Sequence, residues 1–152
     1  MGAEFWSYWV PYQKDLNAAL KELRQREFQA GRYYQPPEVE PGFFGSVFRQ
    51  QHEPSKPKPP SNIREAIKAS SPTGTRSILD IKRVAERPNF YTAALLPPEE
   101  LVRLFGTDKP THPVIEENEE LAVGIERGQG ECIIAFKDGK PDEIYFAGYS
   151  FD

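Results

Sequence analysis

The chain has 152 residues, of which 38% are hydrophobic and 15 are prolines, and its formal net charge at pH 7 is −4. This length is sufficient for a hydrophobic core, so we expect a single domain over residues 1–152. No apolar run approaches the length of a membrane span, and the N-terminus lacks the basic and apolar regions of a signal peptide. We therefore expect neither membrane association nor export.

Charge is distributed unevenly along the chain. Residues 1–96 carry 14 Lys and Arg against 10 Asp and Glu, whereas residues 97–152 carry 5 against 13. An acidic half disfavours nucleic acid and suits a basic partner, although such charge also serves simply to keep a surface solvated. The single cysteine, Cys132, excludes an internal disulfide and indicates a reducing compartment, so we expect a cytoplasmic protein.

The N-terminal residues 5–10 are aromatic and β-branched, which predicts a strand that ends at Pro11. In such a strand Trp6 and Tyr8 lie on one face and Trp9 lies on the other. We interpret these rings as core residues, with a surface that lines a ligand as the alternative.

A helix and a long irregular segment follow. The apolar period of residues 14–30 predicts a helix that stops at Gly31. Seven prolines then fall between Pro36 and Pro60. We expect a proline-rich irregular loop at about 33–60, which serves as a lid, a docking site or a packed segment.

The middle of the chain predicts a short helix and a hairpin. Asn62 begins a helix over residues 62–70, because Asn at this position and Glu65 three residues later resemble a capping box. Residues 76–84 and 90–96 are then expected to form two antiparallel strands of a hairpin.

Two helices are predicted next. The first starts with Pro97-Pro98-Glu99-Glu100, where prolines and acids suit a first turn, and ends at Gly106. The second covers residues 111–127, with Asn118 counted in its apolar stripe. Its outer face carries four carboxylates: Glu116, Glu117, Glu119 and Glu120.

The C-terminal residues 131–152 predict a β-hairpin. Two runs rich in aromatic and aliphatic residues flank Asp138-Gly139, a dipeptide that readily adopts positive φ. Both runs are apolar on both faces, so we expect them at the centre of the sheet. The complete element order predicts an α+β domain with one mainly antiparallel sheet of about five strands and helices packed on one face.

Several short runs are familiar in combination: Gly74-Thr-Arg-Ser-Ile-Leu-Asp-Ile81, Leu104-Phe-Gly-Thr-Asp-Lys-Pro110 and Asp142-Glu-Ile-Tyr-Phe-Ala-Gly-Tyr-Ser150. Together they resemble a family of small uncharacterised bacterial proteins, over nearly the whole chain except the proline-rich loop. The resemblance implies a bacterial cytoplasmic protein. The family has no established function, so it assigns no catalytic or binding residue.

Motifs for catalysis or cofactor binding are missing from the sequence. The glycines do not form a phosphate-binding loop, and two histidines with one cysteine do not suit a zinc site. A pair of Cys132 with His112 is a weaker interpretation than an inert buried thiol. Asp80, Arg76 and Glu143 lie on predicted strands, where they suit the exposed face of a sheet better than an acid–base site. We expect no cofactor, no metal and no catalytic residue.

Two functions from different classes remain. The first is a non-enzymatic protein-binding module, such as an adaptor, regulator or immunity-type protein, with the four glutamates contacting a basic partner. The alternative is a small enzyme or ligand-binding domain with an aromatic-lined sheet face, formed by Trp6, Tyr8, Tyr145 and Tyr149. A deep pocket among these rings favours the alternative, and a flat surface favours the first. Nucleic acid is not expected, because no dense basic stripe accompanies the aromatics.

Overall fold

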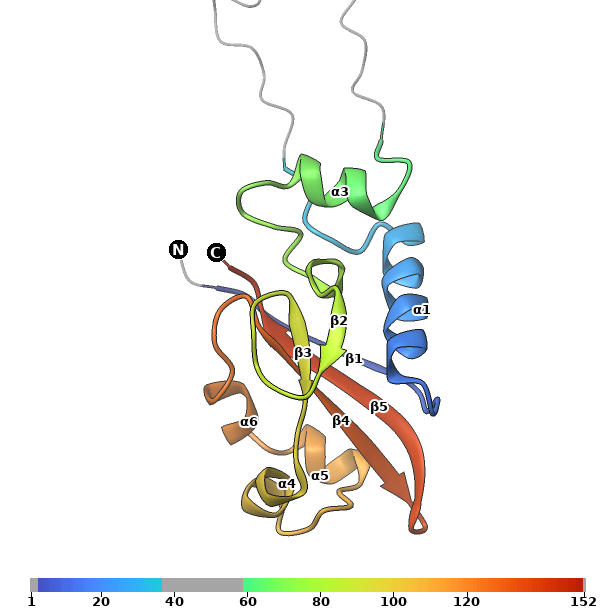
Figure 1. Ribbon diagram of the computed structural model, residues 1–152, viewed down its shortest axis with the longest axis vertical. Helices are drawn as coiled ribbons and strands as arrows, with labels where there is room; N and C mark the ends of the chain where they lie inside the picture. The colour runs from blue at the N-terminus through green and yellow to red at the C-terminus, as the bar shows by residue number, and fades with distance from the viewer. Residues whose placement is uncertain (1–2, 37–58, 152) are drawn as a thin grey trace, which may run out of the picture.

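The computed structural model describes residues 3–36 and 59–151, which form one five-stranded sheet in the order β1-β5-β4-β3-β2 (Figure 1). The strands are β1 (Phe5–Pro11), β2 (Arg83–Ala85), β3 (Thr92–Leu95), β4 (Gly130–Lys137) and β5 (Lys140–Tyr149). The helices are α1 (Leu16–Gln29), α3 (Ile63–Ala69), α4 (Pro98–Phe105), α5 (His112–Glu116), α6 (Glu120–Val123) and the 3-10 helix η2 (Ile78–Asp80). Residues 37–58, most of the predicted loop, lie outside the described residues.

The two central strands are the predicted C-terminal hairpin. β4 and β5 pair antiparallel around a two-residue turn at Asp138 and Gly139. Both turn residues have positive φ, 52° and 77°, as a type I′ turn requires. β1 pairs antiparallel with the other side of β5, and β3 lies on the other side of β4, so the hairpin is central as expected.

The predicted hairpin of residues 76–84 and 90–96 is wrong, and so is the expectation of a mainly antiparallel sheet. β2 pairs with β3 in parallel and β3 with β4 in parallel, so the sheet is mixed. The first half of the expected strand forms η2, where the Ser77 side chain accepts a hydrogen bond from the Leu79 N–H. Between β2 and β3 the chain crosses back, with Tyr91 at φ 63°. Strands of three or four residues are too short for their side-chain alternation to distinguish parallel from antiparallel pairing.

Helices cover both faces of the sheet, whereas the sequence predicted helices on one face only. Figure 1 shows α1 on one side of the sheet and α4, α5 and α6 on the other. The buried core under α1 and η2 comprises Trp6, Val10, Ala19, Leu20, Leu23, Ile78, Ile81, Ala93, Cys132, Ile144 and Phe146. The core on the opposite face comprises Ile115, Leu121, Ile125, Ile133, Ala135, Tyr145 and Ala147. Because the central strands are apolar on both faces, each face requires its own cover.

A large ring crosses the sheet above two glycines. Trp6 on β1 is aligned with Gly148 on β5, which is aligned with Gly130 on β4. A Cβ added at Gly148 would lie 2.6 Å from both Trp6 Cη2 and the Gln129 carbonyl oxygen, and one at Gly130 would lie 2.9 Å from Trp6 Cη2. The absence of these two side chains therefore lets the indole lie flat across three strands.

Three predicted helices are confirmed, and local capping explains each of them. α1 begins after Asp15, whose carboxylate accepts from the Ala18 N–H at 3.0 Å. α3 begins after Asn62, whose amide oxygen accepts from the Glu65 N–H at 2.9 Å. α4 has Pro98 in its first turn and ends at Gly106 in the left-handed conformation.

The helix predicted over residues 111–127 is interrupted, and the structure contains α5 and α6 in its place. The interruption lies at Asn118. Its side-chain oxygen accepts from the Leu121 N–H at 3.0 Å, and its amide group donates to the Leu104 carbonyl at 2.8 Å. Asn118 thus competes with the helical backbone instead of filling the apolar stripe.

Candidate functional site

The four aromatic residues predicted to line a ligand do not form one surface. Trp6 and Tyr8 lie on the α1 face of the sheet, whereas Tyr145 and Tyr149 pack with the core on the opposite face. The strand register explains the separation, because aligned residues share a face of the sheet. Tyr145 is aligned with Trp9 and Tyr149 with Phe5, whereas Trp6 and Tyr8 lie on the other face. Trp6 is only 7% exposed and Tyr145 8%, so both rings serve mainly as core.

The four predicted partner-binding glutamates are exposed but do not share one helix face. Glu116 is the last residue of α5, Glu117 and Glu119 lie between the two short helices, and Glu120 begins α6. Glu116 is distinguished by a specific contact: its Oε1 accepts from Trp9 Nε1 at 2.8 Å. This bond places one predicted glutamate beside β1, the edge strand of the sheet.

β1 presents an open edge. It pairs with β5 on one side only, and no other strand of the described residues pairs with it. The Ser150 N–H donates to the Glu4 carbonyl at 2.9 Å, and the Tyr12 N–H donates to the Asp142 carbonyl at 3.0 Å. Along an antiparallel strand, successive residues direct their backbone N–H and carbonyl groups alternately toward the paired strand and away from it. Because Glu4 and Tyr12 bond toward β5, the even-numbered residues between them do so as well.

The odd-numbered residues of β1 consequently direct their backbone groups away from the sheet. Phe5, Ser7 and Trp9 each offer an N–H and a carbonyl on this edge, and Pro11 ends it because proline has no N–H. The strand has seven residues and no charged side chain. Natural sheets commonly protect such edges with charges, bulges or short strands.

The opposite edge of the sheet is protected in these ways. β2 has only three residues and includes Arg83. The Val84 N–H is bonded to the Asn17 side-chain oxygen of α1 at 2.9 Å. The two edges therefore differ: β2 is short, contains a cation and is bonded to a side chain of α1, whereas β1 is longer, uncharged and, within the described residues, without a strand on its outer side.

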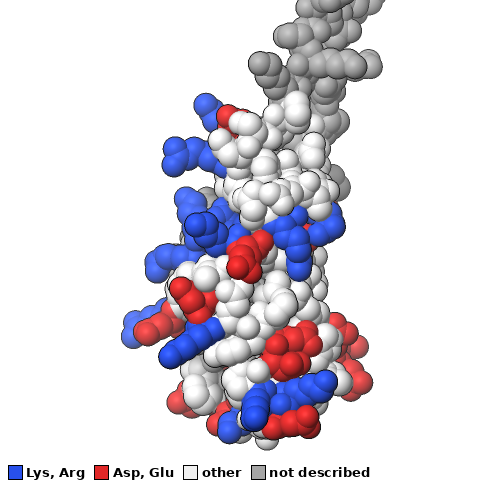
Figure 2. All heavy atoms as spheres, turned by 90° about the vertical axis from the view of Figure 1, so that its right-hand side faces the viewer, with Lys and Arg blue, Asp and Glu red and all other residues white. Residues whose placement is uncertain are grey.

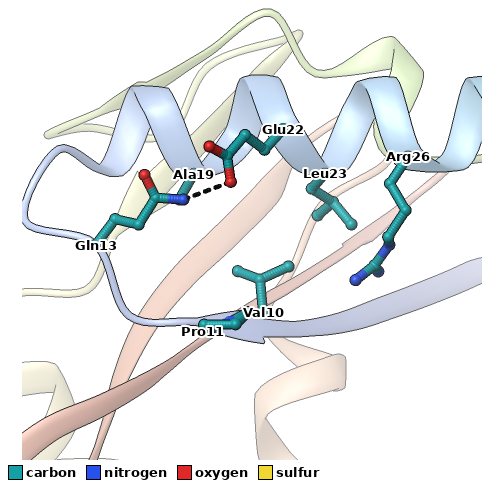
Figure 3. A pocket seen from close by; sticks show the side chains of 7 residues that line it. All are labelled: Val10, Pro11, Gln13, Ala19, Glu22, Leu23 and Arg26. Carbon is teal, nitrogen blue, oxygen red and sulfur yellow. Dashed lines mark hydrogen bonds between the residues drawn. The ribbon is translucent and has the colours of Figure 1, made fainter.

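A groove of about 320 Å³ lies between β1 and α1. Figure 3 shows Val10 and Leu23 facing each other across it, with Arg26 extending toward β1 at one end. At the other end Gln13 Nε2 donates to Glu22 Oε2 at 2.8 Å. The groove thus has apolar walls and polar ends, and charges of both signs are mixed over the α1 side of the molecule (Figure 2).

The other face of β1 carries a cluster of Trp9, His112, Glu116 and Glu143. The imidazole of His112 stacks on the Trp9 indole, with 3.6 Å between ring centroids and 10° between planes. His112 Nδ1 lies 3.1 Å from Glu143 Oε2, and Nε2 lies 3.6 Å from Glu116 Oε1. Sequence reasoning missed this cluster, because its members are distant in the chain and only the fold brings them together.

The arrangement of this cluster does not suit nucleophilic catalysis. His112 Nδ1 is within hydrogen-bond distance of Glu143, and Nε2 is directed at Glu116, so both ring nitrogens face carboxylates and not a hydroxyl or thiol. Cys132 belongs to the core on the opposite face of the sheet, so a Cys132–His112 pair is excluded. Burial also raises the pKa of the Cys132 thiol to about 12.

The remaining acid–base candidates do not converge either. Asp80 accepts from the N–H and hydroxyl of Thr75 at 2.9 and 2.8 Å, far along the chain and on another face from Glu143. Burial raises the pKa of the Asp80 carboxyl and lowers that of the neighbouring Arg24, which donates to the Leu79 carbonyl. These bonds satisfy the irregular backbone around η2, which is a structural role.

One titratable residue was missed by sequence reasoning. Glu131 on β4 has a pKa raised to about 7, because burial penalises its charge and Glu100 adds repulsion, while Arg103 partly opposes both. It does not line the groove between β1 and α1. Within residues 3–36 and 59–151, no group of three or more His, Cys, Asp or Glu is arranged to hold a metal ion.

Comparisons with protein-family models, with curated proteins and with solved structures find no match for this chain. Among the described residues, none of the helices is both long and apolar enough to cross a membrane. The molecule belongs to the α+β class by its mixed sheet. Its open edge is the feature of the described residues best suited to binding.

Proposed function

We propose that this protein is a non-enzymatic binding module that accepts an extended peptide segment of another protein as an additional strand on β1. The observation that carries the proposal is the open, uncharged edge at Phe5, Ser7 and Trp9. Backbone groups of an added strand supply affinity, and pockets beside the strand supply selectivity. The groove along α1 lies on one face of β1 and the Trp9 cluster on the other, so the side chains of an added strand would meet two different surfaces.

Bacterial origin and cytoplasmic location belong to this proposal as well. They rest on the sequence resemblance and on the single cysteine, Cys132, which is buried and free. The alternative of a ligand-binding sheet face has less support, because the four rings that would form it lie on two faces.

The first experiment identifies peptides and locates them. Seven-residue peptides are selected from a random displayed library against the immobilised protein, and binding is measured by calorimetry. Amide hydrogen exchange is then followed by NMR with and without peptide. We expect the exchange rates of the exposed amides of Phe5, Ser7 and Trp9 to fall by a factor of about ten or more in the complex, because each amide gains a backbone partner. Trp6, Tyr8 and Val10 are already bonded to β5 and should change little.

A substitution tests the same edge from the protein side. Ser7→Pro removes an outward N–H without removing a bond to β5, and proline is tolerated at such edge positions. We expect Ser7→Pro to abolish peptide binding, whereas Ser7→Ala, which keeps the N–H, retains it. If circular dichroism shows that Ser7→Pro does not fold, peptides N-methylated on alternate residues replace it, and only one of the two phases should bind.

Three results would overturn the proposal. The first is a selected peptide that binds without slowing exchange at the outward amides of β1. The second is equal binding by both N-methylated phases. The third is self-association on ultracentrifugation with protection of the same amides in the absence of peptide, which would make the edge an interface between copies of this chain.

A further inference from the structure

We infer that the bound segment alternates apolar and basic residues, with apolar side chains entering the groove along α1 and basic side chains meeting Glu116. This inference rests on the proposed function and specifies its partner. It follows from the different chemistry of the two faces of β1.

The geometry of a strand separates these two sets of side chains. Residues of an added strand that lie opposite Tyr8 and Val10 point to the α1 face, as those residues do. Residues opposite Ser7 and Trp9 point to the face that carries α5. Adjacent residues of the peptide therefore meet different surfaces, and a recognised sequence has a period of two.

The α1 face favours an apolar side chain. Val10, Ala19 and Leu23 line the groove, so an aliphatic group that enters it would contact apolar side chains and leave part of its surface out of water. Glu22 is already bonded to Gln13 at the end of the groove, and Arg26 lies at the other end. A positively charged residue of the peptide would approach Arg26 there, and an apolar residue would not be repelled.

The α5 face favours a cation. Glu116 lies at the tip of the Trp9 side chain and its own side chain is 54% exposed, so a partner can reach it. Glu143 adds a second carboxylate across His112, with 30% of its side chain exposed. A lysine opposite Trp9 can lay its methylene stem along the edge of the indole, whose face is stacked on His112, and bring its ammonium group to Glu116.

A second copy of this chain fits this face poorly. A copy paired through its own β1 would place a residue of Phe5–Pro11 opposite Trp9, and none of these residues is basic. Charge complementarity therefore favours a different chain.

Three synthetic peptides test the inference. Each has seven residues, with valine at alternating positions and either lysine, glutamine or glutamate between them. Binding is measured by calorimetry in about 20 mM and about 500 mM sodium chloride. At low salt we expect the lysine peptide to bind about three- to fivefold more tightly than the glutamine peptide, and the glutamate peptide more weakly than both. High salt should remove most of these differences.

Matched variants assign the effect to one carboxylate. Glu116→Gln removes the charge and keeps an oxygen acceptor for Trp9, so the edge strand stays in place. Glu119→Gln removes the same charge from an exposed position in the same segment. We expect the first variant to lose the preference for lysine over glutamine, and the second to retain it.

The outcomes separate this inference from the proposed function. If peptides protect the outward amides of β1 but the three charge types bind equally, the inference is overturned and strand addition stands. A lysine preference that Glu119→Gln reduces as much as Glu116→Gln also overturns it, because the effect would then be net charge. If none of the peptides protects these amides, while library peptides do, the alternating pattern is rejected. If no peptide of either origin protects them, the proposed function itself fails.

Discussion

Glu131 is a carboxylic acid placed where its charge is costly. It lies on β4, aligned with Ala94 of β3, and Glu100 and Arg103 of α4 are near enough to affect its pKa. Burial is the largest cause of its raised pKa of about 7, against an ordinary value of 4.5 for a glutamate. The native state thus holds this proton more tightly than the unfolded state does.

This difference predicts a pH dependence of stability. The contribution of Glu131 is fully present below about pH 4.5 and is lost as the pH rises through about 7. Glu131→Gln removes this loss, because the amide does not ionise. We therefore expect the variant to be more stable, compared with wild type, at pH 8 than at pH 4.5, by about 1–2 kcal/mol in the free energy of unfolding. That figure is below the full linkage value because the side chain is partly exposed. Urea denaturation at both pH values measures it, and an equal difference at both would contradict the assignment.

Adjacent residues on β4 show what sequence can reveal at this scale. The burial of Cys132 was predicted from its apolar run and is confirmed, with 0% of the residue exposed. Glu131 escaped notice because its burial comes from the fold, and the charges that act on it, Glu100 and Arg103, are more than twenty-five residues away in the chain. A strand pattern shows which residues share a face but not how deeply a carboxylate on that face is covered.

At the scale of elements, the contact of Trp6 with Gly148 joins β1 to the centre of the sheet. We expect Gly148→Ala to destabilise the protein by about 3 kcal/mol, because the added methyl group meets both the indole and a backbone carbonyl that cannot easily move. Gly139→Ala is the matched control: no atom lies within 4 Å of its Cβ position, so only its positive φ opposes the substitution, at about 1 kcal/mol. Equal losses in thermal denaturation would show that the indole can shift.

Asn118 separates α5 from α6, and its two hydrogen bonds predict two distinguishable losses. Asn118→Asp keeps the acceptor for the Leu121 N–H and removes the donor to the Leu104 carbonyl, whereas Asn118→Ala removes both. We expect a loss of about 1–2 kcal/mol for alanine and a smaller loss for aspartate. A gain in stability and helical content for alanine would indicate that a continuous helix is preferred.

Helices and strands could be predicted from the sequence where the residues that start or stop them are close by in the chain. α1, α3 and α4 were predicted because each has its start or stop signal within a few residues of its end, such as Asn62 or Gly106. The prediction of one helix over residues 111–127 was wrong. Asn118 occupies a position of the apolar period, but its side chain bonds to the Leu104 carbonyl, and the period gives no sign of that contact. The predicted antiparallel pairing of β2 with β3 was wrong, because the direction of β3 depends on its pairing with β4, which is distant in the chain.

For the whole molecule, two cores share one sheet. Leu20 of α1 belongs to one core and Ile115 of α5 to the other, and each is nearly fully buried. Because the β4–β5 hairpin contributes to both cores, we expect one cooperative unfolding transition. Leu20→Ala and Ile115→Ala should each lower the free energy of unfolding by about 2–4 kcal/mol, and their effects should add to within about 0.5 kcal/mol. Urea titrations followed by circular dichroism measure this, and two separate transitions would contradict it.

The α+β class and a single sheet of five strands were predicted and are confirmed, whereas the distribution of layers was not. The sequence shows that β4 and β5 are apolar on both faces. It does not show on which face each amphipathic helix packs, because a helix stripe fits either face equally well. For the candidate site, Glu116 was named from sequence, but its contact with Trp9 required the fold.

The placement of the two tryptophans on opposite faces of one strand has an optical consequence. Trp6 lies in a dry interior above glycines, whereas Trp9 is partly exposed and stacked on His112. The intrinsic fluorescence of the protein is therefore the sum of two emitters in different surroundings, both carried by β1. Replacing Trp6 by phenylalanine would leave the emission of Trp9 alone. Its intensity and wavelength would then report directly on any molecule that reaches the open edge.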